Sequence, residues 1–230
     1  MIAALSLMKR RPDISLAQFR KHWLDPHGVM TAELPGVRHY IQSHFLESPH
    51  SNALARQLAI DGMPELWFDS YDDRKIAYTS PRIAECNVDS EHFVGAVTRI
   101  VTEPVVIVAP PRLEPLKLQS AAPVGTRLGS AAPQQSPKAV LIATGDADVA
   151  WADSTLAHIM TLPGIIGYVR HNILEQAAAP NSKIPEFTLA VAGVAEITFD
   201  ATETLAHHAQ TFAALDGRTA VYIVEDYVLR

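Results

Sequence analysis

The sequence is poor in the residues that several common classes of protein need. Its 230 residues include one cysteine, Cys86, which excludes an intramolecular disulfide and a cysteine-based zinc cluster. Basic residues (19) are fewer than acidic residues (25) and form no block, so the formal net charge is −6. Nucleic-acid binding is therefore not expected, because neutralising phosphates requires clustered cations.

Long apolar runs are also missing. None approaches the roughly 18 residues that a membrane-spanning helix needs. The apolar residues 2–8 precede the basic Lys9, Arg10 and Arg11, which is the reverse of a signal peptide. We expect a cytoplasmic protein with no membrane partner.

Motifs for nucleotides and metals are absent as well. The sequence contains no P-loop, no Gly-x-Gly-x-x-Gly and no His-Glu-x-x-His. The adjacent His207 and His208 cannot share one face of a helix and make a poor metal pair. The sequence therefore predicts neither a cofactor nor a metal.

What the chain does contain is an internal repeat and enough apolar material (48% hydrophobic residues) for a core. Three blocks recur in the same order in the two halves. They pair residues 34–42 with 162–170, residues 62–69 with 193–200, and residues 100–105 with 222–227. The ordered set indicates a duplication.

Between the repeats, residues 109–137 are rich in proline, alanine and serine. Proline removes backbone donors and interrupts helices, so this composition is typical of a linker. We predict a first domain at residues 1–108, a linker at 109–137 and a degenerate second domain at 138–230.

The first half follows the order β-α-β-β-α-β, which is that of a ferredoxin-like unit. Ser15 and Gln18 form a capping box ahead of a helix that begins at Leu16, and residues 37–46 alternate with period two. We expect an α+β fold in which two βαββαβ units pack sheet to sheet as an intrachain dimeric α/β-barrel. The predicted interior is lined by Tyr40, Gln42, His44, Glu65 and Trp67, and by their counterparts Tyr168, Arg170, Asn172, Glu196 and Thr198.

A family resemblance covers most of the first half. The residues that carry it are Arg10–Ser15, Phe19–Trp23, Pro26–Gly28, Leu34–Gly36, Tyr40, Gln42–His44, Ala59–Gly62, Glu65–Ser70, Thr79–Pro81 and Phe93. This stretch resembles the EthD family, here in a tandem two-copy version. The resemblance implies a dimeric α/β-barrel that acts on small hydrophobic molecules, usually without a metal, with histidines as acid and base in several members.

Three residues are candidates for catalysis. His44 and His27 can exchange protons near neutral pH, and Tyr40 can orient or protonate a substrate oxygen. Each also has a structural interpretation: a hydrogen-bonded core histidine, a histidine that caps a broken helix, and a packed core tyrosine. In an ungapped alignment of the repeats, Asn172 stands at the position of His44, and Thr155 stands at the position of His27. The site is therefore expected to lie in the first half. His171 is expected to point to the opposite face of its sheet.

The expected contacts to a small hydrophobic ligand come from five residues. They are Gln42, Trp67, Trp23, Glu65 and Arg170. Trp67 could also simply fill the barrel, and Glu65 could form an ion pair with Arg38 or Arg170.

Two functions follow as hypotheses. The first is a cofactor-independent isomerase, lyase or cyclase that acts on a lactone, carbonyl or polyketide-like compound by histidine acid–base chemistry. The alternative is a non-catalytic binding or accessory protein for a hydrophobic metabolite. A haem- or oxygen-dependent oxidation is conceivable for the fold, but no axial ligand stands out. Pairing of two chains into a homodimer is left open.

Overall fold

The computed structural model describes the chain except for residues 112–117, 120–126, 129–135, 146–160, 177–181 and 214–216. Most of the predicted linker 109–137 therefore lies outside the described residues. The domain boundaries at 108 and 138 stay a prediction.

The first half forms strands and helices in the predicted order, with extra helical segments. They are β1 (Ile2–Arg10), α1 (Leu16–His22), the π-helical turn η1 (Trp23–His27), α2 (Gly28–Ala32), β2 (Val37–Phe45), α3 (Ala53–Leu58), β3 (Gly62–Phe68), α4 (Tyr71–Tyr78), α5 (Pro81–Ser90) and β4 (Val94–Val108). The capping box at Ser15 and Gln18 is confirmed. Helix α5 was not predicted as a separate element; its N-cap is Ser80, and Pro81 occupies its first turn.

The second half repeats the strand plan. It contains β7 (Lys138–Thr144), β8 (Ile165–Gln176), β9 (Val191–Phe199), α7 (Thr202–Ala213) and β10 (Thr219–Val228). Two short strands, β5 (Leu118–Gln119) and β6 (Arg127–Leu128), pair with each other and lie apart from the main sheet.

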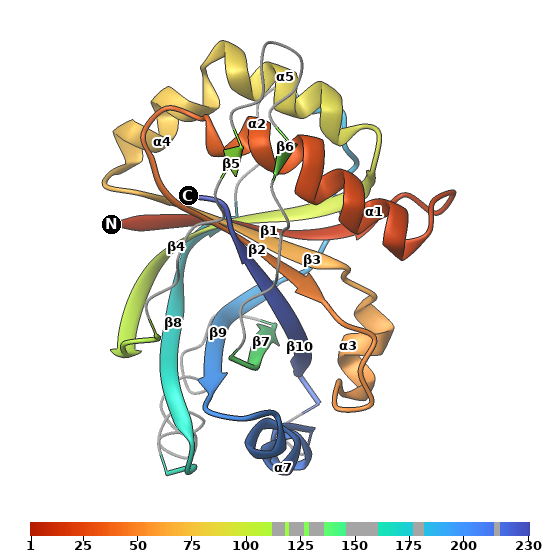
Figure 1. Cartoon of the computed structure of the whole chain (residues 1–230), viewed down its shortest axis with the longest axis vertical. Coiled ribbons are helices and arrows are strands. Elements are labelled where there is room, and N and C mark those ends of the chain that lie inside the picture. The colour runs from red at the N-terminus through yellow and green to blue at the C-terminus, as the bar shows by residue number, and fades with distance from the viewer. Residues whose placement is uncertain (112–117, 120–126, 129–135, 146–160, 177–181, 214–216) are drawn as a thin grey trace.

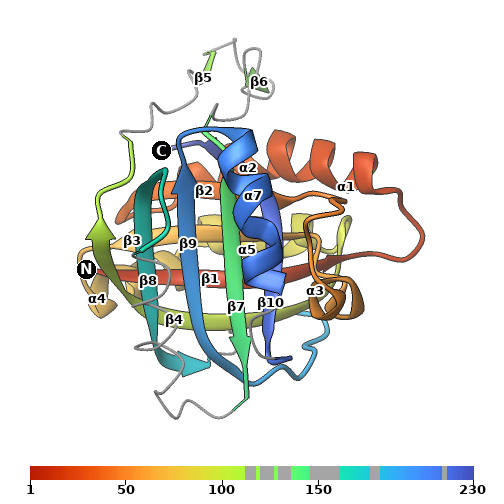
Figure 2. The same cartoon turned by 90° about the horizontal axis from the view of Figure 1, so that it is seen from below.

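Eight strands close into one antiparallel barrel in the order β1-β3-β2-β10-β7-β9-β8-β4 (Figures 1 and 2). Each half contributes four neighbouring strands, and the halves join where β2 pairs with β10 and where β4 pairs with β8. The predicted intrachain barrel of two ferredoxin-like units is thus confirmed. Closure leaves neither four-stranded sheet with an unpaired edge.

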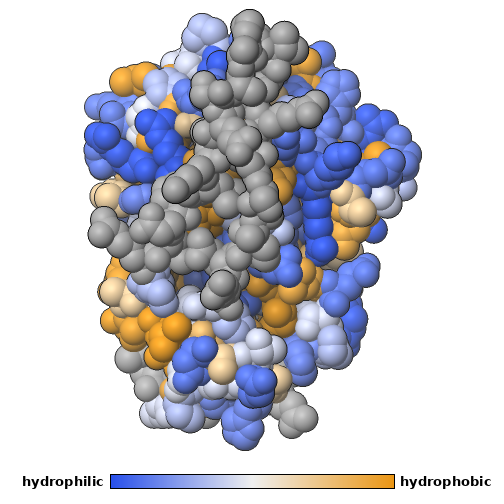
Figure 3. Space-filling view, in the orientation of Figure 1, coloured by the Kyte–Doolittle hydropathy of each residue, from blue (hydrophilic) through white to orange (hydrophobic). Residues whose placement is uncertain are grey.

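The helices cover the outside of the barrel. Figures 1 and 2 show α1, α2, α4 and α5 over the N-terminal strands, and α7 on the C-terminal strands at the opposite side. Most of the N-terminal sheet is therefore covered on both faces, by helices outside and by the other half inside, while the C-terminal end of β4 stays partly exposed. On the face shown in Figure 3, apolar surface gathers over the lower half, where Figure 1 places the barrel strands.

The repeated Leu-Pro-Gly block has a structural reason. Gly36 and Gly164 both have a positive φ, 75° and 78°, in the turns that lead into β2 and β8. Only glycine adopts this conformation without strain. A Cβ at Gly36 would also lie 3.2 Å from the Cβ of Asp73.

Four apolar clusters of described residues hold the layers together, one of them around Phe19, Trp23 and Phe93; the other three lie as follows. One fills the barrel interior with residues from both halves, such as Leu5, Met63 and Val194. The second lies between the N-terminal strands and their helices, and the third lies outside the C-terminal strands, against α7. Among the described residues, no helix has both the length and the apolar character to cross a membrane.

Candidate functional site

The predicted site residues divide between the two faces of the N-terminal sheet. Tyr40 lies directly opposite Leu66, whereas Glu65 lies opposite Ile41. Directly opposite residues of an antiparallel pair share a face, so Tyr40, Gln42 and His44 face the helices, while Glu65 and Trp67 face the barrel interior. The prediction that all five line one interior is therefore wrong. The side of β2 that carries Tyr40, Gln42 and His44 was interpreted as the side that faces the barrel cavity. Because this part of the strand is covered on both faces, the polar residues did not mark the cavity side.

Gln42 links the residues on the helix-facing side. Its Nε2 donates to the backbone oxygen of Trp23 (2.8 Å) and to the hydroxyl of Tyr40 (2.7 Å), and its Oε1 lies 3.0 Å from His44 Nε2. Because both amide protons of Gln42 are used, Oε1 accepts from His44, whose proton is thereby placed on Nε2. The structure thus brings together four of the residues predicted from the sequence.

His44 is enclosed rather than exposed to a cavity. Its ring stacks on Trp23 with centroids 4.4 Å apart and an interplanar angle of 9°, and Tyr227 packs against it at 4.7 Å. Burial, together with the charge of Arg20, lowers its pKa to about 3. A neutral ring with one nitrogen engaged suits a positioning residue better than a proton carrier near pH 7.

The ring of Trp23 packs closely against the backbone of Gly62. A Cβ at Gly62 would lie 2.8 Å from Cη2 of Trp23 and 3.1 Å from the backbone oxygen of Ser43. We expect Gly62→Ala to lower the free energy of unfolding by about 1–3 kcal/mol, because an added methyl group overpacks this contact. Urea denaturation measures the loss. Gly217→Ala is the control, since no atom lies within 4 Å of its Cβ position; equal stability of the two variants would contradict the prediction.

His27 is held by a carboxylate that sequence reasoning missed. Its Nδ1 lies 2.9 Å from Asp89 Oδ2, while Asp89 Oδ1 lies 3.0 Å from His22 Nε2. Burial acts to raise the pKa of Asp89, but hydrogen bonds from His27 and His22 outweigh it and leave that pKa below its usual value. The ionised carboxylate accepts the Nδ1 proton of His27, so the lone pair of this imidazole lies on Nε2. Helix α5 carries Asp89 to this place, and its Ser80-Pro81 start was the available signal in the sequence.

A small cavity lies between the N-terminal sheet and these helices. Its volume is about 80 Å³; a single water needs about 10–15 Å³ by the same measure. His27, Tyr40 and Trp23 line it together with apolar side chains, which include Leu34, Leu66, Ile83 and Val97, and with polar ones, which include Thr31, Asn87, Ser90 and Arg99. Burial raises the pKa of Tyr40, so its phenol stays protonated, and burial raises the pKa of Cys86, also in the lining, to about 11. Cys86 is therefore a thiol at neutral pH and lacks the thiolate that a nucleophile needs.

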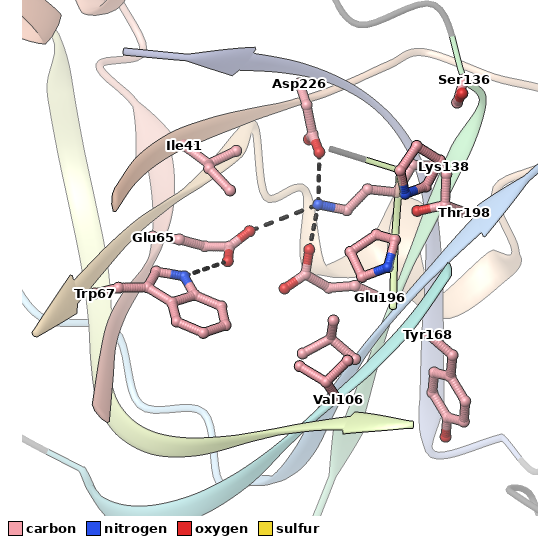
Figure 4. Close-up of a pocket in the computed structure, with 13 residues that line it drawn as sticks. Ile41, Glu65, Trp67, Val106, Ser136, Lys138, Tyr168, Glu196, Thr198 and Asp226 are labelled. Carbon is pink, nitrogen blue, oxygen red and sulfur yellow. Dashed lines mark hydrogen bonds and ion pairs between the residues drawn. The ribbon is translucent and has the colours of Figure 1, made fainter. Parts of the chain in front are cut away.

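The barrel interior holds a second polar cluster, which joins the two halves (Figure 4). Lys138 forms ion pairs with Asp226 at 2.7 Å, with Glu65 at 3.6 Å and, at short range, with Glu196. Burial disfavours the charge of Lys138, but the three carboxylates together raise its pKa well above the usual value. Lys138 and Asp226 were not predicted, because they come from strands of the second half that meet Glu65 only in the closed barrel.

His171 also belongs to this cluster. Its Nε2 lies 2.6 Å from Glu196 Oε1 and its Nδ1 lies 3.0 Å from the hydroxyl of Thr102. The expectation that His171 points away from the interior is wrong. It pairs with Val194, whereas Arg170 pairs with Ala195 and so lies on the outer face with Tyr168. The interior position predicted for Arg170 is therefore also wrong, whereas Tyr168 faces outward by register but borders the cavity drawn in Figure 4.

The interior cluster offers three metal-type ligands. Atoms of Glu65, His171 and Glu196 lie within 4.8 Å of one another. The ammonium group of Lys138, however, already serves as their cation and would repel a metal ion placed among them. The donor set fits an internal ion-pair network better than a metal.

Comparison with known proteins agrees with this architecture. The model of the EthD domain matches residues 11–96. Most of the first half of the chain therefore matches the EthD domain. This segment supplies His27, Tyr40 and Asp89, as well as His22, which bonds Asp89 but does not line the cavity. No curated protein matches the sequence.

Solved structures extend the likeness to the second half. An anthrone oxidase-like protein superposes over 99% of this chain and 93% of its own, with a TM-score of 0.59 and 10% identity. A protein provisionally described as a monooxygenase, from Fusobacterium nucleatum, covers 100% of this chain and 92% of its own, with a TM-score of 0.51 and 7% identity. An EthD family protein from Bacillus halodurans covers 45% of this chain and 98% of its own at 20% identity, with a TM-score of 0.38. At these identities, the two whole-chain likenesses show the barrel fold alone.

Proposed function

We propose that the protein is a cofactor-independent enzyme of the isomerase, lyase or cyclase type, which moves a proton on a small apolar lactone or carbonyl compound. The observation that carries the proposal is the hydrogen bond from His27 to the Asp89 carboxylate at the wall of a mainly apolar cavity that also contains the Tyr40 hydroxyl. The EthD domain and the barrel fold support a small-molecule site. We place the reaction in the cytoplasm, as the sequence predicts.

In this proposal each residue has a distinct task. Asp89 fixes the ring of His27 through Nδ1, and Nε2 removes a proton from the carbon beside the substrate carbonyl. The Tyr40 hydroxyl donates to the carbonyl oxygen as negative charge develops on it. His27 then returns the proton to another carbon or to the leaving oxygen. Gln42 and His44 hold Tyr40 and Trp23 in place, so their predicted roles become positioning roles.

The apolar lining favours an apolar substrate. Leu34, Leu66 and Val97 line part of the cavity with side chains that make no hydrogen bonds. Exclusion of water strengthens the hydrogen bond from Tyr40, because the local dielectric constant is low. The size of the cavity limits the substrate to a small molecule.

The test is deuterium exchange of small cyclic ketones and lactones in D₂O, followed by NMR. We expect the protein to catalyse exchange at the carbon beside the carbonyl. His27→Gln is expected to reduce the rate by about 10²–10⁴-fold, the usual contribution of a general base, and Asp89→Asn by at least about tenfold, because the ring loses its orientation.

His22→Gln is the matched control. His22 bonds the same carboxylate but does not line the cavity, so the rate is expected to fall by less than about threefold. Full exchange by the His27→Gln variant would refute the mechanism. Binding of the ketones without any exchange by the unmodified protein would favour the alternative, a non-catalytic binding protein for a hydrophobic metabolite.

A further inference from the structure

The second half of the chain reaches the cavity of the His27 site through the segment that precedes β9. Residues 182–190 of this segment lie along the start of β4 and are called the strap below. Ile184 of the strap lines the cavity together with His27 and Tyr40. Among the described residues of the cavity wall, Ile184 alone comes from the second half. The cavity is therefore built from both halves, although the proton-transfer groups come from the first.

Backbone hydrogen bonds hold the strap beside β4. Val97 N donates to the backbone oxygen of Pro185 at 3.0 Å, and Phe187 N donates to the backbone oxygen of Val97 at 3.2 Å. The Thr98 hydroxyl also donates to the backbone oxygen of Phe187. Strand β4 pairs with β8 from Ile100 to Val108, so the strap takes the place of β8 beside the start of β4. Main-chain bonds of this kind do not depend on the side chain at position 184.

Side chains of the first half fix the strap as well. Arg99 Nη2 donates to Ser182 Oγ at 2.9 Å, and its Nη1 lies 3.4 Å from Glu186 Oε1. The ammonium group of Lys9 lies 4.5 Å from the centroid of the Phe187 ring. Because Arg99 also lines the cavity, these contacts join the strap directly to the cavity wall.

Ile184 separates the cavity from solvent. It is 7% exposed and packs in the apolar cluster that contains Trp23 and Phe93, whereas its chain neighbours Lys183 and Pro185 are exposed. Isoleucine is branched at Cβ and has few rotamers, so its side chain is a stiff boundary. The extent of the cavity on this side is therefore set by the side chain at position 184.

We propose that Ile184 determines the size of the molecule that the His27 site accepts, so that the second half controls the specificity of a reaction carried out by the first. The inference takes its substrate class, a small apolar carbonyl compound, from the proposed function. Alanine at position 184 removes three side-chain carbons. Because backbone bonds keep the strap in place, the space left behind is available to a larger apolar ring.

Two ketones that differ by three methylene groups test the inference. Cyclopentanone and cyclooctanone share the carbonyl group and differ in ring size, and calorimetric titration measures their affinities without requiring turnover. In Ile184→Ala we expect the affinity for cyclooctanone relative to cyclopentanone to rise by at least about tenfold, since each further buried methylene contributes about fourfold, or about 0.8 kcal/mol. Ile184→Val removes one carbon and should raise the ratio by about fourfold, which keeps the test available if the alanine variant does not fold.

Leu189→Ala is the matched control. Leu189 belongs to the strap but packs on the barrel-interior cluster and does not line the cavity. Its replacement should change the ratio of the two affinities by less than about twofold, as expected for a site without shared contacts.

Three results would overturn the inference: an unchanged ratio in both Ile184 variants, an equal change in Leu189→Ala, or no binding of either ketone to any of these proteins. Deuterium exchange separates this inference from the proposed function. A raised ratio without exchange refutes the proposed reaction alone, whereas exchange with an unchanged ratio refutes the role of Ile184 alone.

Discussion

Lys138→Met is expected to lower the free energy of unfolding by about 3–5 kcal/mol at pH 7. The side chain is 8% exposed and faces the carboxylates of Glu65, Glu196 and Asp226. Methionine has a similar length but no charge, so the anions lose their cation without regaining water. A domain of this kind is stable by about 5–15 kcal/mol in total, so the variant should be close to unfolding at ambient temperature. Urea denaturation at pH 7 measures the change.

Two comparisons separate this effect from a general loss of lysine. Lys183 is exposed and lies 3.6 Å from Glu91, and Lys183→Met should cost less than about 1 kcal/mol, as surface ion pairs do. Adding Glu196→Gln and Asp226→Asn to Lys138→Met should restore much of the stability. A cost below about 1 kcal/mol for Lys138→Met would show that water solvates the interior carboxylates.

Acid is expected to destabilise the protein through His44. Its pKa is about 3 in the folded protein, compared with about 6.5 for an ordinary histidine. Between these values the unfolded chain binds a proton that the folded chain does not. The stabilisation is therefore complete above about pH 6.5 and is lost as the pH falls toward 3. At pH 4 the loss reaches about 3 kcal/mol by this linkage.

The variant His44→Phe isolates this contribution, because phenylalanine keeps an aromatic ring against Trp23 and cannot titrate. Other groups, such as Asp89, also titrate in acid, but they remain in both proteins. We expect the stability difference between the unmodified protein and the variant to shift by about 3 kcal/mol in favour of the variant between pH 7 and pH 4. Denaturation curves at intervals of half a pH unit give the difference, and a difference independent of pH would contradict the prediction.

The fold was largely predictable because its signals are local. The capping box of Ser15 and Gln18 marks the first helix, and the Leu-Pro-Gly blocks mark turns that need a positive φ at Gly36 and Gly164. The ordered repeat then indicates two copies of one unit. Each ferredoxin-like sheet has one face without helices, and the two sheets of one chain can cover these faces by packing on each other.

The site was predictable only in part because both faces of the N-terminal sheet are buried. In a strand with one wet face, alternation of polar and apolar residues tells the two faces apart. In β2, Tyr40 and Ile41 are both enclosed, so alternation could not assign Tyr40 to the helices. Lys138 and Asp226 meet Glu65 only through long-range strand pairing. Asp89 approaches His27 across two helices, and no spacing in the sequence encodes that contact.

The single chain allows the barrel to be asymmetric in a way that two identical subunits could not. Strand register places Trp67 opposite Ala3 in one half, and in the other half Thr198 opposite Lys138. Equivalent strand pairs therefore carry different side chains. In the first half the large ring of Trp67 lies opposite the methyl group of Ala3, and in the second half the long cationic side chain of Lys138 lies opposite the short hydroxyl of Thr198. Under exact twofold symmetry, either residue would appear twice and meet its own copy across the axis. Because the two copies are joined in one chain, their sequences can differ, so the first half contributes the bulky Trp67 to the barrel and the second half contributes the positive charge of Lys138.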